Sequence, residues 1–215
     1  MKQRLLIALL GLTASAALAI PVDNLLVQNF SGSDLIPDNN ASGRAYSFNF
    51  ATPTPAMISG LTIDLTLTGG WNGDLYAYLS HGSSLAVLFN RIGRTVGTPD
   101  GSGSSGMTVQ FSDVYLTDIH NFSGTSLTGN FAADGRNVNP LNVLNTSART
   151  ATLDSFLGAD PNGSWTLFFA DLAPGGAATV KNWSVSVSLP DSGATAGLLL
   201  GMLPLLGVLR RCWRR

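Results

Sequence analysis

The sequence contains no glutamate and has only two lysines, two histidines and one cysteine. Every acidic residue is therefore an aspartate, a residue that favours turns and loops over the interior of helices. A helical protein of this length would normally carry Glu and Lys on its exposed helix faces. Together with the 24 glycines, these absences predict a chain that is nearly all β.

The single cysteine, Cys212, cannot form an internal disulfide, so the fold must be stable by packing alone. A length of 215 residues fits one domain with one core. Basic residues are scarce as well: from Ile20 to Pro190 there are twelve Asp against six Arg and Lys, a net charge of −6. Binding phosphates needs a basic stripe, so we predict no nucleic-acid partner.

The N-terminus has the three parts of a secretory signal peptide. A basic start is followed by an apolar run at residues 5–12 and by the small residues Ala17 and Ala19. We predict cleavage after Ala19 and hence an exported protein; the alternative is a buried first helix, which the adjacent Pro21 disfavours. The predicted organisation is a signal peptide at 1–19, a sandwich domain at 20–188 and a tail at 189–215.

The most regular pattern lies in residues 157–189, where apolar and polar residues alternate in two runs. Trp165 and Trp183 fall on the inward side of these runs, and the Pro- and Gly-containing segment between them is typical of a turn. We therefore predict two neighbouring antiparallel strands that bury both indoles.

Similar alternation predicts further strands along the chain, for a total of about eight. Residues 61–68, 75–79 and 85–89 are expected to pair as a meander, with Tyr76 and Tyr78 on the outer face, where they could hold a glycan or another protein. Residues 93–106 contain Gly, Ser, Thr and Pro without apolar periodicity, which predicts a long flexible loop. The remaining expected strands lie at 46–50 and 107–111.

Two of these segments resemble the P domain, also called the Homo B domain, of proprotein convertases. One runs from Gly163 through Trp165-Thr-Leu, Asp171 and a glycine turn to Trp183-Ser-Val-Ser-Val; the other is Trp71-Asn-Gly-Asp-Leu-Tyr-Ala-Tyr-Leu-Ser. The resemblance implies a jelly-roll β-sandwich. It also implies an accessory domain, because the catalytic machinery of the convertases belongs to a separate subtilisin-like domain.

Residues able to support catalysis or metal binding are few. A hydrolase needs a base, and only His81 and His120 are available, neither beside a Gly-x-Ser-x-Gly elbow, so we predict that the chain is not an enzyme. The alternative is a small secreted hydrolase that uses one of these histidines with a nearby Ser. Asp74, Asp113 and Asp171 lie at expected strand ends; we predict that they cap turns rather than bind metal, with Ca²⁺ as the alternative cofactor.

The tail has a motif, an apolar segment and a basic end in that order. The apolar residues 194–209 would span about 24 Å as a helix, short of a hydrocarbon core of roughly 30 Å. The motif consists of Leu189, Pro190, Asp191, Ser192 and Gly193, and the stop-transfer arginines are Arg210, Arg211, Arg214 and Arg215.

This order resembles a PEP-CTERM-type sorting signal in its Val-Pro-Asp-Ser-Gly variant, with Leu189 in place of Val. The resemblance implies processing by an exosortase of a Gram-negative bacterium. The same residues also approach the Leu-Pro-x-Thr-Gly signal of Gram-positive sortases, and a permanent membrane anchor is the further alternative.

We therefore predict an exported, non-enzymatic P-domain-like protein that is held in the inner membrane during export. An exosortase then sorts it to the cell surface or extracellular matrix. Its role there is expected to be structural, adhesive or binding, with a surface polysaccharide or a protein as the candidate partner.

Overall fold

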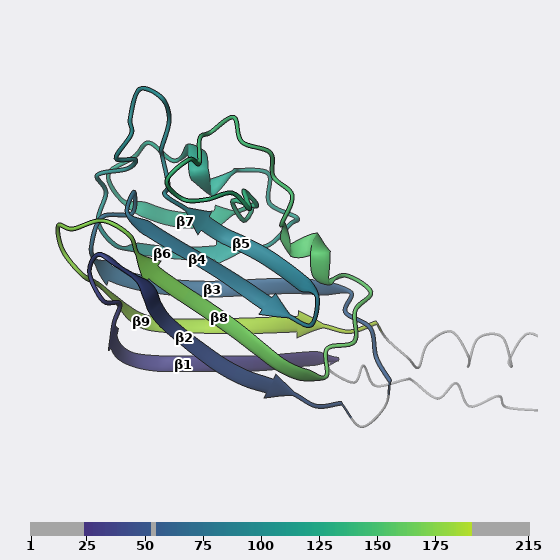
Figure 1. Ribbon diagram of the computed structural model, residues 1–215. Helices are drawn as coiled ribbons and strands as arrows, with labels where there is room; N and C mark the ends of the chain where they lie inside the picture. The colour runs from purple at the N-terminus through teal and green to yellow at the C-terminus, as the bar shows by residue number, and fades with distance from the viewer. Residues whose placement is uncertain (1–23, 53–54, 191–215) are drawn as a thin grey trace, which may run out of the picture. The chain divides into compact units, whose positions relative to one another are not determined.

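The computed structural model describes residues 24–52 and 55–190, which form one compact unit from Asn24 to Pro190. This unit is a β-sandwich of two sheets (Figure 1). The strands are β1 Leu25–Leu35, β2 Asn40–Phe50, β3 Gly60–Gly69, β4 Leu75–His81, β5 Ser84–Asn90, β6 Met107–Phe111, β7 Leu127–Phe131, β8 Gly163–Asp171 and β9 Ala178–Ser188; the 3-10 helices are η1 Ile119–Asn121 and η2 Leu153–Phe156. The predicted all-β sandwich is confirmed, with nine strands in the described residues instead of about eight.

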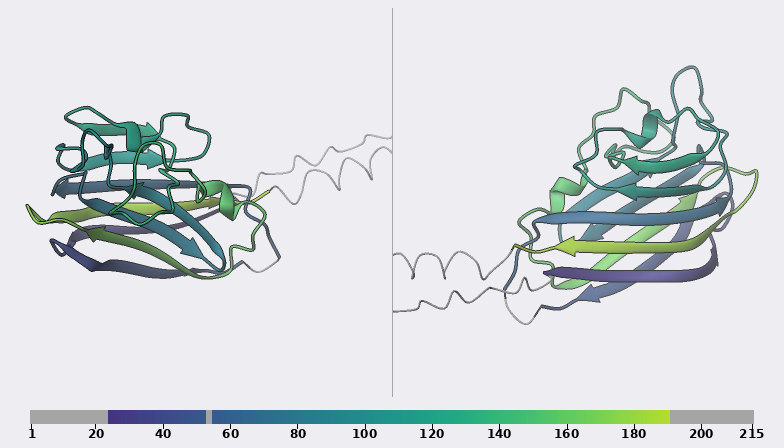
Figure 2. Two further views of the ribbon diagram at one scale, coloured as in Figure 1. Left: turned by 45° about the horizontal axis from the view of Figure 1, so that its top comes forward. Right: turned by 180° about the vertical axis from the view of Figure 1, so that it is seen from behind.

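The five-stranded sheet has the order β1-β9-β3-β6-β7 and the four-stranded sheet the order β2-β8-β4-β5. Neighbours are antiparallel except β6 and β7, which are parallel. The strands of the two sheets cross at an angle, as the views in Figure 2 show. The inward faces of the two sheets enclose a single core.

The strands follow the predicted alternation because every second side chain points into the core. On β3 the residues Leu61, Ile63, Leu65 and Leu67 are buried, while the threonines between them are half-buried. Residues on β6 and β9 continue the same pattern across the sheet. Sequence periodicity therefore identified which face of β3, β6 and β9 is apolar.

Both indoles are buried as predicted, but they do not lie on neighbouring strands. Trp165 is 0% exposed and Trp183 is 4% exposed. β8 belongs to the four-stranded sheet and β9 to the five-stranded one, so the prediction of an antiparallel pair is wrong. The connection at 172–177 is longer than a two-residue hairpin turn, and it carries the chain from one sheet to the other, a spacing of about 10 Å.

The predicted meander is also wrong in its first pairing. β4 pairs with β5, but β3 lies in the other sheet between β9 and β6. Because both edges of β3 are occupied, the chain has to cross to the second sheet after Gly69 and Gly70. Both glycines have positive φ, and a Cβ on Gly70 would lie 2.8 Å from Cβ of Ala178, so this crossing requires glycine.

Two strands were not predicted, β1 and β7. β1 pairs with β9 from Leu25 opposite Ser188 to Leu35 opposite Thr179, with an irregularity between Ser31 and Asp34. β7 is an edge strand of five residues, of which Leu127 and Phe131 are buried. The described residues contain no helix long and apolar enough to cross a membrane. The predicted signal peptide and the predicted helix at 194–209 lie outside the described residues.

Candidate functional site

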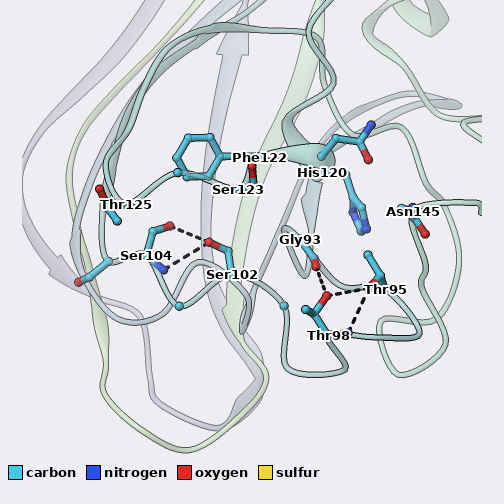
Figure 3. Close-up of a pocket in the computed structure, with 15 residues that line it drawn as sticks. Gly93, Thr95, Thr98, Ser102, Ser104, His120, Phe122, Ser123, Thr125 and Asn145 are labelled. Atoms are coloured by element: carbon cyan, nitrogen blue, oxygen red, sulfur yellow. Dashed lines mark hydrogen bonds between the residues drawn. The ribbon is translucent and has the colours of Figure 1, made fainter.

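A hollow of about 860 Å³ opens between two loops at one end of the sandwich, and we call it the hydroxyl groove. One wall is the segment 93–105 between β5 and β6, and the other is the segment 120–125, which begins within η1 (Figure 3). Asn145 borders it from a third segment. The volume lies within the range of about 300 to 1,000 Å³ typical of ligand-binding clefts.

The first wall is held in place by backbone hydrogen bonds, contrary to the predicted flexible loop. The Ser102 amide donates to the Ile92 carbonyl at 2.7 Å, and the Gly73 amide donates to the Ser102 carbonyl at 2.9 Å. A Cβ on Gly73 would collide with the carbonyl oxygen of Asp100, so only glycine permits this close approach of the two segments.

Asn72 is the side chain that fixes this wall to the sandwich. It is 0% exposed, and its Nδ2 donates to Ser104 Oγ and to the Gly106 carbonyl, each at 2.8 Å. The backbone amide of Asn72 also donates to the Ser104 carbonyl, at 2.9 Å. One buried residue before β4 thus orders the loop between β5 and β6.

The second wall rests on a buried ionic network. Nδ1 of His120 lies 2.8 Å from Oδ2 of Asp134, and both side chains are 0% exposed. Arg136 donates to Asp134 Oδ1 at 3.0 Å and to Asp118 Oδ2 at 2.9 Å. Because every charge in this network has a partner of opposite sign, the network can be buried and can fix η1.

Most of the residues that line the groove carry a hydroxyl or amide side chain. Some bond to one another: Thr95 and Thr98 at 2.7 Å, and Ser102 and Ser104 at 2.9 Å (Figure 3). Within the described part of the chain, no Asp, Lys or Arg lines the groove. The ring of Phe122, partly buried against the core and edge-on to Phe131 at 6.4 Å, supplies an aromatic surface.

The two histidines do not have the geometry of the hydrolase considered above. His120 has the Asp partner of a catalytic dyad, but its Nε2 lies 3.0 Å from the Arg94 carbonyl instead of facing a serine hydroxyl. His81 has Nδ1 2.9 Å from the Ser164 carbonyl and Nε2 2.7 Å from the Asp160 carbonyl, and its ring stacks on Trp165 at 4.3 Å. Both nitrogens of each ring therefore already face acceptors.

The structure brings together two of the three aspartates considered for Ca²⁺. Asp74 precedes β4 and Asp171 ends β8, and Asp171 is opposite Leu75 in the ladder, whereas Asp113 lies beside Asp154. Oδ1 of Asp74 is 3.4 Å from Arg91, and Oδ1 of Asp171 accepts from the Ala173 amide at 3.4 Å, as in the predicted turn-capping role. Within residues 24–52 and 55–190, no three His, Cys or Asp side chains are grouped to hold a metal.

Burial raises the pKa of these carboxyl groups. It raises the pKa of Asp171 to about 6, with a further contribution from the negative charges of Asp38 and Asp74. Burial and the nearby Asp154 raise the pKa of Asp113 to about 6. Burial also raises the pKa of Asp74, although the Arg91 guanidinium opposes it.

Tyr76 and Tyr78 lie on the outer face of β4 as predicted, and both are half-buried. The ring of Tyr78 stacks on Phe168 of β8 at 5.0 Å and is 5.9 Å from the ring of Tyr76. This aromatic row therefore contributes to the packing between neighbouring strands.

Of the predicted sorting motif, Leu189 and Pro190 are described. The Leu189 amide donates to the Asn24 carbonyl at 2.7 Å, and Asn24 Nδ2 donates to the Pro190 carbonyl at 3.1 Å. Asp191, Ser192 and Gly193, the four terminal arginines and the predicted cleavage residues Ala17 and Ala19 lie outside the described residues.

Comparison with known proteins found no matching family model and no matching curated protein. Among solved structures, the fold is similar to the crystal structure of a serine protease of Aeromonas sobria, at 13% identity and a TM-score of 0.43. It is also similar to the structure of that organism's serine protease with a chaperone, at 16% identity and a TM-score of 0.42. Each match covers 78% of this chain but only 28% and 26% of the other, so the chain spans about a quarter of their length.

These two comparisons contradict the prediction that the chain is not an enzyme, because both structures are of serine proteases. That prediction rested on the scarcity of histidine, and we withdraw it. The likeness is one of fold over about a quarter of each protease, and it assigns no catalytic residue to this chain.

The hydroxyl groove was not predicted from the sequence. Its walls come from segments that are about twenty residues apart, and neither contains a recognisable motif. The only signal was the lack of charged residues in 101–106 and 119–131, two stretches that are otherwise rich in Ser, Thr and Gly.

Proposed function

We propose that this chain is an exported surface module with a structural, adhesive or binding role. Its sandwich is a jelly roll of the P-domain type, and its tail is read by an exosortase that sorts the protein to the cell surface or extracellular matrix of a Gram-negative bacterium. The resemblance at Trp71–Ser80 and Gly163–Val187 supports the domain type, and the motif, apolar segment and arginines of the tail support the sorting.

The observation that carries the proposal is where the folded unit ends. All nine strands of the described chain lie between Leu25 and Ser188, and the compact unit closes at Pro190, within the motif. Asn24 binds both Leu189 and Pro190. An enzyme that cuts after this point therefore removes none of these nine described strands, which is what processing of a folded exported domain requires.

The position of the hydroxyl groove agrees with display on a surface. β3 begins at Gly60 opposite Ser188, the last residue of β9, and ends at Gly69. Its ten residues span about 30 Å. The groove follows the far end, since a Cβ on Gly106 would lie 2.9 Å from the Leu67 carbonyl. The sandwich thus presents the groove at the end remote from the point where the tail leaves it.

Sorting is tested by expressing the full chain in a Gram-negative host with and without its exosortase. We expect the wild-type protein to reach the surface or medium only when the exosortase is present. Deletion of residues 190–193 should leave the protein in the inner membrane fraction of both hosts. The host without exosortase is the matched control for the deletion.

Equal surface delivery in the two hosts would contradict exosortase sorting. Membrane retention of the wild type in both hosts would instead identify the tail as the permanent anchor considered above.

A further inference from the structure

We infer that the hydroxyl groove binds a neutral polysaccharide. This inference rests on the proposed function, because it names the ligand that a displayed module would hold. The structure supplies three observations for it: unpaired hydroxyl and amide groups, a lining without Asp, Lys or Arg, and an aromatic ring at the same surface.

The first observation is a set of polar side chains that the protein itself does not use. Within the described part of the chain, Ser105, Ser123, Thr125 and Asn145 line the groove and are exposed, and none of their side chains has a protein hydrogen-bond partner. Each hydroxyl offers one donor and two acceptor lone pairs, and the amide offers two donors and an acceptor. A polyol presents the same mixed donors and acceptors, so it can form hydrogen bonds with groups of this kind.

The second observation is the lack of charge. A charged ligand that loses water in the groove would need a counter-charge, and no Asp, Lys or Arg lines the groove in the described residues. His120 does line the groove, but its ring nitrogens already face Asp134 Oδ2 and the Arg94 carbonyl. Arg136, behind the wall, is paired with both Asp134 and Asp118. This arrangement favours a neutral sugar over a phosphate, a uronic acid or a charged peptide.

The third observation is the aromatic ring of Phe122, which lies on the second wall beside Ser123 (Figure 3). An aromatic face carries partial negative charge and attracts the polarised C–H bonds on one side of a sugar ring. Combined with neighbouring hydroxyl groups, such a ring binds both the apolar face and the polar edge of a saccharide. The groove has a volume of about 860 Å³, so it has room for a ligand that is larger than a single side chain.

Gly103 allows the groove to be filled without disturbing the fold. It is exposed in the first wall, has no positive φ, and a Cβ added to it would meet no atom within 4 Å. Gly97 is its matched control, because it belongs to the same loop, is exposed, has no positive φ, and does not line the groove.

The test is affinity electrophoresis of the full chain in mild detergent, with soluble dextran, galactomannan or xylan in the gel and with anionic alginate as the charged comparison. We expect at least one neutral polymer to retard the wild type and alginate to have no effect. Gly103→Trp should abolish the retardation, and Gly97→Trp should leave it unchanged.

Substitutions that each remove one hydroxyl group from the groove make the binding test more specific. Ser123→Ala and Thr125→Val should each weaken binding about three- to tenfold, as expected for one neutral hydrogen bond, without a change in melting temperature. Thr117→Val is the control, since Thr117 is exposed and lies outside the groove. Unchanged affinity in all the groove variants would overturn the inference.

Three other results would also overturn it: no retardation by any of the neutral polymers, retardation by alginate alone, or loss of binding in Tyr78→Ala but not in Gly103→Trp. The last would place the ligand on the outer sheet face. Each result is separate from the sorting experiment, because binding is measured on purified full chain and sorting on cell fractions.

Discussion

Phe48 of β2 connects the two buried tryptophans across the core. Its ring lies 6.4 Å from Trp165 in a stacked arrangement and 5.3 Å from Trp183. Trp165 also donates from Nε1 to the Pro161 carbonyl at 2.9 Å and stacks on Phe156 at 5.2 Å. These contacts join the two sheets at the centre of the sandwich.

We predict that Trp165→Ala lowers the free energy of unfolding by about 3 to 5 kcal/mol, from lost apolar burial and the cavity that remains. Domains of this kind are stable by about 5 to 15 kcal/mol in total, so the variant should unfold at much lower urea concentration. Trp71→Ala is the control, because Trp71 is 45% exposed. Equal urea midpoints for the two variants would contradict the central role of Trp165.

Asp171 should make stability depend on pH. Burial raises its folded pKa to about 6 from an ordinary value of 3.8, so the folded state binds more protons than the unfolded state between about pH 4 and 6. The contribution of this group to stability therefore falls as the pH rises through that window. Its buried Oδ2 has no hydrogen-bond partner, which agrees with a costly charged form.

Asp171→Asn is therefore expected to raise stability at pH 7.5, on the order of 1 kcal/mol, and to flatten the slope between pH 4 and 6. Thermal unfolding at several pH values measures both effects, with the exposed Asp100→Asn as the control. Destabilisation at pH 7.5 would show that the carboxylate has a partner. If millimolar Ca²⁺ raised the melting temperature of the wild type but not of this variant, that partner would be the metal.

Among the elements, the segment 93–106 shows how a distant side chain orders a loop. Asn72 donates to both Ser104 and Gly106 from a fully buried position. Asn72→Ala should cost about 1 to 3 kcal/mol and should accelerate amide hydrogen exchange in residues 102–106, because the Gly106 carbonyl loses its donor. The exposed Asn137→Ala is the control. Unchanged exchange would mean that the backbone bonds alone hold the wall.

Periodicity in the sequence predicted most strands but few of their neighbours. The alternation of Leu61, Ile63 and Leu65 identifies a buried face, and that information is local. Which strand lies beside β3 depends on long-range packing, and β9 and β6 occupy both of its edges. The same limit explains the error over β8 and β9, whose alternation is identical whether they pair within a sheet or face each other across the core.

The groove could be predicted even less well. Its polar groups come from three segments that are brought together only by the fold, and Ser, Thr and Gly in each segment are typical of any loop. His120 and Asp134 are 14 residues apart and gave no local pattern. The sorting motif, by contrast, is contiguous, so it could be recognised from the sequence alone.

For the whole molecule, the place where the chain is cut decides what the mature protein keeps. The nine strands of the described residues end at Ser188, and the groove lies about one strand length away from that end of the sandwich. A protein released or transferred after the motif keeps both, whereas a permanently anchored protein keeps its terminal arginines.

Mass spectrometry of the exported protein from an exosortase-containing host decides between these outcomes most directly. We predict a mature N-terminus at Ile20 and a C-terminus within or beside residues 189–193, with the apolar segment and the four arginines removed. An exported protein whose C-terminus is still Arg215 would contradict the proposed processing.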